Sequence, residues 1–117
     1  MAEGMNMFVA IYRWRLDPER EQDFVANWQR ITLSGLAGGS GGSSLFRNAQ
    51  GIWVAIARWP SREARDRFFG AFDRSGDDSE MTRRARLAVI ERLPDEELDS
   101  VLDCWAPFRD INGSSMP

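Results

Sequence analysis

Few side chains in this sequence could carry out chemistry, and Tyr12 is the most distinctive of them because it is the only tyrosine. The chain has no histidine and a single cysteine, Cys104. The commonest metal ligand and the usual general base at neutral pH are therefore missing. A lone cysteine can form neither an internal disulfide nor a zinc site. The sequence predicts no metal and no cofactor, and leaves aromatic side chains as the main candidates for a site.

Aromatic residues are abundant, with five tryptophans and seven phenylalanines in 117 residues. Either the core is rich in rings or some of the rings line a pocket or a partner surface. The net charge of −3 argues against nucleic acid or an anionic membrane as the partner, since both require a positive field. The apolar run from Met5 to Tyr12 is too short for a signal peptide, which predicts a cytoplasmic protein.

Alternating residues predict the strands. Residues 8–15 form one strand that is apolar on both faces near its start, which is typical of a central strand. Residues 45–48 and 52–59 form a hairpin around a tight connection at 49–51. The second hairpin strand has Ile52, Val54 and Ile56 on one face and alanines with tryptophans on the other. The pattern does not say which of these faces meets the helices.

Three segments have helical spacing. The first begins at Asp17 and Pro18 and ends near Gly35, followed by a flexible connection at 35–44. Ser61 caps the second helix, whose apolar stripe includes Phe68 and Phe72. The third begins near Asp77, which has capping-box spacing to Glu80, and ends at residues 93–94.

The last stretch is ambiguous. Residues 98–106 fit a final strand, which we favour because the sheet would otherwise leave a long central edge uncovered. The alternative is a helix beginning at Pro94. With the strand included, the element order predicts an α+β fold, the ferredoxin-like split βαβ with a four-stranded antiparallel sheet. The predicted domain spans 7–107, between a flexible segment at 1–6 and a disordered tail at 108–117.

Helices can cover only one face of such a sheet. The other face carries Val9 and Ile11, and an apolar patch of this kind is a liability in water. Packing of this face against a second copy would bury it. The sequence therefore predicts a homodimer that pairs through the open sheet face.

Four stretches are distinctive: FVAIYRWRLDPEREQDF (8–24), GGSGGSSLFRN (38–48), WVAIARWPSREARDRF (53–68) and LDSVLDCW (98–105). Together they resemble the antibiotic biosynthesis monooxygenase family of dimeric α/β barrels, and the last resembles the family's final strand. The family includes cofactor-free oxygenases of polycyclic phenols and haem-degrading enzymes. Haem-degrading members have an asparagine and a tryptophan where this chain has Tyr12 and Phe68, and they use a histidine that it lacks. The resemblance therefore does not imply haem degradation.

The resemblance implies a cofactor-independent monooxygenase acting on a flat aromatic substrate such as a phenol, a quinol or a polyketide-like ring system. An electron-rich phenolate can itself reduce oxygen, so the protein would supply an apolar cavity and hydrogen-bond partners. Tyr12 is the candidate catalytic residue. The candidate substrate-binding residues are Asn48, Arg58, Trp59, Phe68 and Phe72. The alternative is a non-catalytic homodimeric domain of the same fold, in which these residues serve the core.

Overall fold

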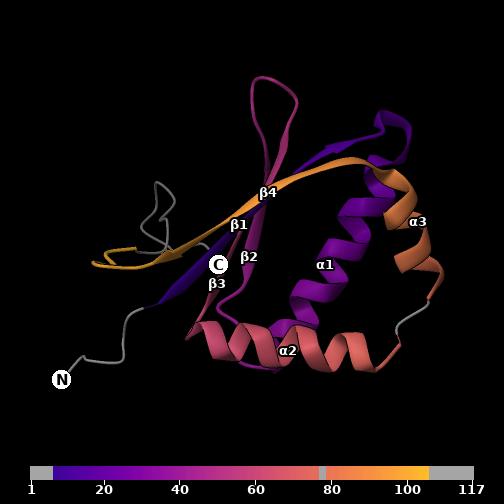
Figure 1. Ribbon diagram of the computed structural model, residues 1–117. Helices are drawn as coiled ribbons and strands as arrows, with labels where there is room; N and C mark the ends of the chain where they lie inside the picture. Colours follow the sequence, from indigo (N-terminus) through magenta and orange to yellow (C-terminus); the bar gives the residue numbers. More distant parts are fainter. Residues whose placement is uncertain (1–6, 77–78, 106–117) are drawn as a thin grey trace, which may run out of the picture.

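A four-stranded antiparallel sheet in the order β2-β3-β1-β4 has its helices on one face (Figure 1). The computed structural model describes residues 7–76 and 79–105. The elements are β1 (Phe8–Leu16), the 3-10 turn η1 (Pro18–Arg20), α1 (Glu21–Ala37), β2 (Ser43–Arg47), β3 (Trp53–Trp59), α2 (Arg62–Arg74), α3 (Glu80–Ala88) and β4 (Val89–Asp99). The predicted α+β, ferredoxin-like fold is confirmed. The predicted terminal segments, 1–6 and 108–117, lie outside the described residues.

β1 is a central strand, as its two apolar faces predicted. It pairs with β3 on one side and with β4 on the other. Every second residue of β1 is buried, beginning with Phe8, and the residues between them are half-buried or exposed. This alternation follows from the geometry of a strand whose two faces meet different surroundings.

The register of β1 on β3 decides which face of β3 meets the helices. Tyr12 pairs with Ala55, and Ala10 pairs with Ala57. Ala55, Ala57 and Trp59 are buried, whereas Val54 and Ile56 on the opposite face are only half-buried. The small alanines leave room for the rings of β1 and α1. The face with alanines and tryptophans therefore belongs to the helix side.

Aromatic side chains dominate the layer between sheet and helices. The Trp14 ring lies 4.8 Å from the Phe24 ring and 5.1 Å from the Trp28 ring, both in edge-on geometry. The Tyr12 and Trp28 ring centroids are 5.9 Å apart. Such offset and edge-on pairs stabilise a core beyond the area they bury.

The first predicted helix is a 3-10 turn followed by α1. Asp17 caps η1, since its side chain accepts a hydrogen bond from the Glu19 amide, and α1 begins at Glu21 without a side-chain cap. The helix continues through Gly35 to Ala37, so the connection to β2 spans only 38–42 rather than 35–44. Gly41 and Gly42 already exchange backbone hydrogen bonds with Arg58 of β3. Tertiary packing outweighs the low helix propensity of glycine here.

The C-terminal elements differ most from the prediction. α3 ends at Ala88 and not at 93–94, and Ser79 caps it by accepting from the Thr82 amide. The predicted cap, Asp77, lies outside the described residues. The last strand is β4, so the strand predicted at 98–106 was placed too late in the chain. The alternative helix beginning at Pro94 is also wrong, because Pro94 lies within β4. Only Leu98 and Asp99 of the LDSVLDCW stretch belong to β4.

Pairing with the free edge of β1 explains why residues 89–99 form a strand. The ladder jumps from the pair Arg13–Leu93 to the pair Ile11–Glu96. Pro94 falls inside this irregularity, where no ladder N–H is needed, and β4 is an edge strand. Proline is tolerated at such positions.

Candidate functional site

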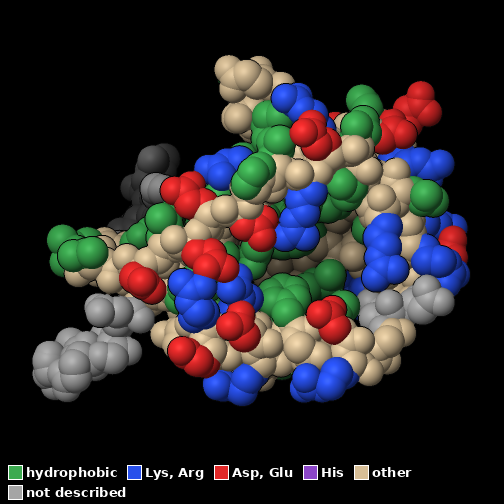
Figure 2. Space-filling model, viewed as in Figure 1, with side chains coloured by type: hydrophobic (Ala, Val, Ile, Leu, Met, Phe, Trp, Pro, Cys, Tyr) green, Lys and Arg blue, Asp and Glu red, His purple; other side chains and the backbone are tan. Residues whose placement is uncertain are grey.

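A small cavity of about 20 Å³ lies between the sheet and the helices α1 and α2. Tyr12 of β1 and Trp59 of β3 line it from the sheet, and Phe68 and Phe69 line it from α2. Its volume suffices for about one water molecule. The space-filling view shows a hollow between β4 and α2 with hydrophobic side chains inside and arginine and carboxylate groups along its edge (Figure 2).

Hydroxyl groups line one part of the cavity. The Ser43 hydroxyl lies 2.7 Å from that of Thr32 and accepts a hydrogen bond from the Trp28 indole N–H at 3.0 Å. The Ser40 hydroxyl donates to the Arg58 carbonyl and accepts from the Gly42 amide. All the residues around the cavity are uncharged. The hydroxyls already bond to protein groups, and the exposed lining is almost wholly apolar, which suits a neutral ring system.

The indole N–H of Trp59 is a buried donor without an acceptor among the described residues. Trp59 is only 3% exposed, and its ring packs 5.5 Å from the Phe68 ring and 6.1 Å from the Phe69 ring. An unsatisfied buried donor costs roughly 1–3 kcal/mol.

The hydroxyl of Tyr12 contacts Arg65 of α2, a residue that sequence reasoning missed. One guanidinium nitrogen of Arg65 donates to the phenolic oxygen at 3.3 Å. The residue spacing in α2 could have predicted that Arg65 faces the sheet. It lies four residues before Phe69 and three before Phe68, within the apolar stripe, where an arginine needs a partner.

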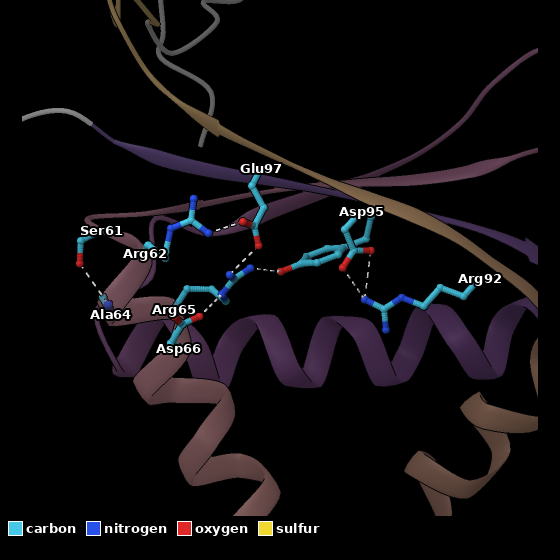
Figure 3. Close-up of polar contacts among 9 residues, drawn as sticks. Ser61, Arg62, Ala64, Arg65, Asp66, Arg92, Asp95 and Glu97 are labelled. Carbon is cyan, nitrogen blue, oxygen red and sulfur yellow. Dashed lines mark hydrogen bonds and ion pairs between the residues drawn. The ribbon is translucent and has the colours of Figure 1, made fainter.

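A carboxylate of β4 holds Arg65 in place (Figure 3). Glu97 accepts from Arg65 at 2.8 Å and also from Arg62, and Asp66 accepts from Arg65 at 2.7 Å. We call Glu97 with its two arginine partners the Glu97 clasp. Burial by itself would lower the pKa of Arg65, but the hydrogen bonds to Glu97, Asp66 and Tyr12 outweigh it and raise the pKa. The guanidinium therefore stays charged.

The Glu97 clasp makes the stability of the fold depend on pH. Hydrogen bonds from Arg65 and Arg62 lower the pKa of the Glu97 carboxyl below its ordinary value. A lowered pKa in the folded state contributes stability above the ordinary glutamate pKa, and that stability is lost as pH falls through the lowered value. We expect the Tm to fall more steeply between about pH 5 and pH 3 in the wild type than in Glu97→Gln.

Thermal unfolding followed by circular dichroism at a series of pH values would measure the two slopes. Arg62→Gln leaves Arg65 as a partner of the same carboxylate and should give an intermediate slope. Equal slopes for the wild type and Glu97→Gln would contradict a role of the clasp in stability.

The structure brings three of the predicted site residues together at the cavity: Tyr12, Trp59 and Phe68. Phe72 lies 6.0 Å from the Phe68 ring but outside the lining. Arg58 is on the other face of the sheet, where its guanidinium lies 5.5 Å from the Trp105 ring.

Asn48 stands in the turn between β2 and β3, away from the cavity lining. Its side-chain oxygen accepts from the amides of Gln50 and Ile52. Gly51 completes this turn at φ +79°, a conformation that favours glycine. The side chain of Asn48 thus stabilises the hairpin.

Within 7–76 and 79–105, no group of three or more acidic or cysteine side chains is placed to hold a metal ion. None of the helices in those same ranges combines the length and apolarity needed to cross a bilayer.

No protein-family model and no curated protein matches the chain. Solved structures do. Rv0793 from Mycobacterium tuberculosis is 18% identical with a TM-score of 0.61, and the match covers 85% of this chain and 99% of that one. A protein from Bordetella bronchiseptica, provisionally assigned as an antibiotic biosynthesis monooxygenase, is 20% identical with a TM-score of 0.64, covering 83% and 99%. The chain has the antibiotic biosynthesis monooxygenase fold.

A third similar structure is described as a dimeric ferredoxin-like protein from an uncultured marine organism. It is 10% identical with a TM-score of 0.66, and the match covers 88% of this chain and 95% of that one. At these identities the likeness establishes the fold, and chemistry must be argued from the cavity itself.

Proposed function

We propose that this protein is a cofactor-independent monooxygenase that oxidises a flat aromatic phenol, quinol or polyketide-like substrate. The observation that carries the proposal is the uncharged cavity at which Tyr12, Trp59 and Phe68 meet. The similar structure from Bordetella bronchiseptica supports the reaction class.

Anthrone illustrates the chemistry. A proton passes from its methylene carbon to solvent and leaves an electron-rich phenolate, which transfers an electron to dioxygen. Recombination forms a carbon–oxygen bond, the resulting peroxide takes up a proton, and loss of water then yields the quinone carbonyl. Dioxygen is the oxidant, one of its oxygen atoms enters the product, and the other leaves as water. In this scheme Tyr12 hydrogen-bonds the substrate oxygen on which negative charge develops, while Trp59 and Phe68 stack on the ring.

A ring system requires more room than the cavity now has, so binding must displace part of its wall. α2 is the element suited to this, because none of its residues is buried. Its Phe68 and Phe69 close the cavity against Trp59. A change of rotamer at Phe68 and Phe69 would enlarge the space next to Tyr12 and leave Arg65 on Glu97.

The proposed assembly is a homodimer that pairs through the open sheet face. Val9, Ile11, Val54 and Ile56 lie on this face and are only half-buried in the single chain. The marine ferredoxin-like structure is described as dimeric. A second copy packed sheet to sheet would remove these side chains from water.

Oxygen uptake by the purified protein with anthrone and with 1,4-naphthohydroquinone tests the reaction. We expect turnover above the spontaneous rate, and we expect Tyr12→Phe to lower kcat by roughly 100-fold, because it loses the hydroxyl that hydrogen-bonds the developing oxyanion. Leu87→Ala, an exposed change on α3, is the control and should match the wild type. Equal rates for Tyr12→Phe and the wild type would contradict the role of Tyr12.

The second candidate function is a non-catalytic homodimeric domain of the same fold, and the cavity volume of about 20 Å³ favours it. A domain without turnover needs no space for a ring system. The same oxygen-uptake measurement separates the two functions, since this second one requires that no aromatic substrate be consumed faster than in buffer.

A further inference from the structure

We infer that Arg65 is a positioning residue that makes Tyr12 a hydrogen-bond donor toward the cavity. The inference rests on the proposed role of Tyr12 in the oxidation. It adds a residue, a direction for the phenolic proton and a constraint on the ligand.

The direction of the proton follows from the donors and acceptors present. A guanidinium group has N–H donors and no acceptor. The contact of 3.3 Å between Arg65 and Tyr12 therefore uses the phenolic oxygen as the acceptor. The single proton of the hydroxyl is left for another acceptor, and Tyr12 lines the cavity. A ligand oxygen there can receive it.

Three contacts restrain Arg65 so that it can hold Tyr12. Glu97 and Asp66 accept from its guanidinium at 2.8 and 2.7 Å, and the guanidinium carbon lies 4.9 Å from the centre of the Phe8 ring. The side chain is only 13% exposed. A restrained, half-buried cation also favours negative charge developing on a ligand oxygen bound to Tyr12.

Arg62 provides a matched comparison within the same cluster. It also donates to Glu97, and it lies 4.8 Å from the Phe8 ring. The described contacts of Arg62 do not include Tyr12, so its removal tests the cluster without the hydroxyl contact.

The ligand class follows from the hydroxyl of Tyr12. Arg65 donates to its oxygen, so Tyr12 offers its O–H to the cavity that it lines. A keto or quinone carbonyl can accept this hydrogen bond, whereas a ring N–H would leave the hydroxyl proton without an acceptor.

The first test is the NMR signal of the only tyrosine in the chain, labelled with ¹³C at Cζ and recorded at pH 7. The signal reports hydrogen bonding at the phenolic oxygen. We expect it to move in Arg65→Met and to stay at the wild-type position in Arg62→Met. A signal unchanged in Arg65→Met, in a variant whose circular dichroism spectrum is native, would overturn the inference.

The second test is a double-mutant cycle on anthrone oxidation. We expect Arg65→Met to lower kcat about tenfold while KM stays within about twofold, because the contact acts through Tyr12. In a Tyr12→Phe background the same change should have little further effect. Arg65→Lys, which keeps a charged donor, should recover part of the rate. Equal losses with and without Tyr12 would assign Arg65 a merely structural role.

The two tests separate this inference from the proposed function. Absence of turnover in the wild type would refute the oxidation, and the tyrosine signal would still decide whether Arg65 positions Tyr12. Binding of anthraquinone, followed by quenching of tryptophan fluorescence, then replaces the kinetic cycle. Weaker binding in Arg65→Met, and only when Tyr12 is present, would support the inference.

Discussion

Replacement of Trp14 by alanine is expected to lower the free energy of unfolding by about 3–5 kcal/mol. Trp14 is 5% exposed, and its ring lies against those of Tyr12, Phe24 and Trp28. Its removal leaves a cavity at the centre of the packed layer, which the rigid β1 and α1 cannot close. The same change takes away the ring beside Tyr12, so the loss of stability should be accompanied by loss of any ligand binding.

Urea unfolding at a fixed protein concentration measures this loss, since the stability of a dimer depends on concentration. Trp105→Ala is the control, because Trp105 is 75% exposed. Its free energy of unfolding should change by no more than about 0.5 kcal/mol, as is usual for surface substitutions. Similar losses for the two variants would contradict the central place of Trp14 in the core.

Replacement of Ile11 by glutamate is expected to convert the proposed homodimer into single chains. Ile11 pairs with Ile56 on one side and with Glu96 on the other, in the middle of the open sheet face. A new carboxylate there would be buried without a partner in the dimer and would lie next to an existing one. We expect the dimer dissociation constant to rise by at least about 100-fold.

Light scattering coupled to size-exclusion chromatography at about 10 µM protein would show the change in mass, with native far-UV circular dichroism as the check on folding. Leu33→Glu is the control, because Leu33 lies on α1 away from the sheet and is 58% exposed. It should elute as the wild type does. A wild type that is already a single chain would refute pairing through the sheet, and a dimeric Ile11→Glu would place the interface elsewhere.

The two predictions concern opposite faces of β1. Trp14 points to the helices and Ile11 to the open side, as alternation along β1 requires. The candidate site lies on the helix side and the proposed contact between copies lies on the other. Changes on one face should therefore affect ligand binding and oligomeric state separately.

Local patterns in the sequence were enough to predict most elements, and three of the six proposed site residues do line the cavity. The alternation along residues 8–15 and the caps at Asp17 and Ser61 depend on neighbouring residues alone, and the structure confirms them. Tyr12, Trp59 and Phe68 were chosen as candidates from sequence, and they do meet. Strand alternation and helical spacing place such side chains on one layer without knowledge of the packing.

Other features required long-range pairing, which local patterns do not contain. Residues 89–93 have helical spacing, but the free edge of β1 offers backbone partners that make them a strand and place Pro94 in an irregularity. Arg65 and Glu97 meet only because α2 and β4 come together in space. Arg58 faces away from Trp59 because successive residues of a strand point to opposite sides. The sequence by itself thus determined most of the elements and the inner faces of β1 and α2, whereas tertiary contacts decided β4, the clasp and the contact between Arg65 and Tyr12.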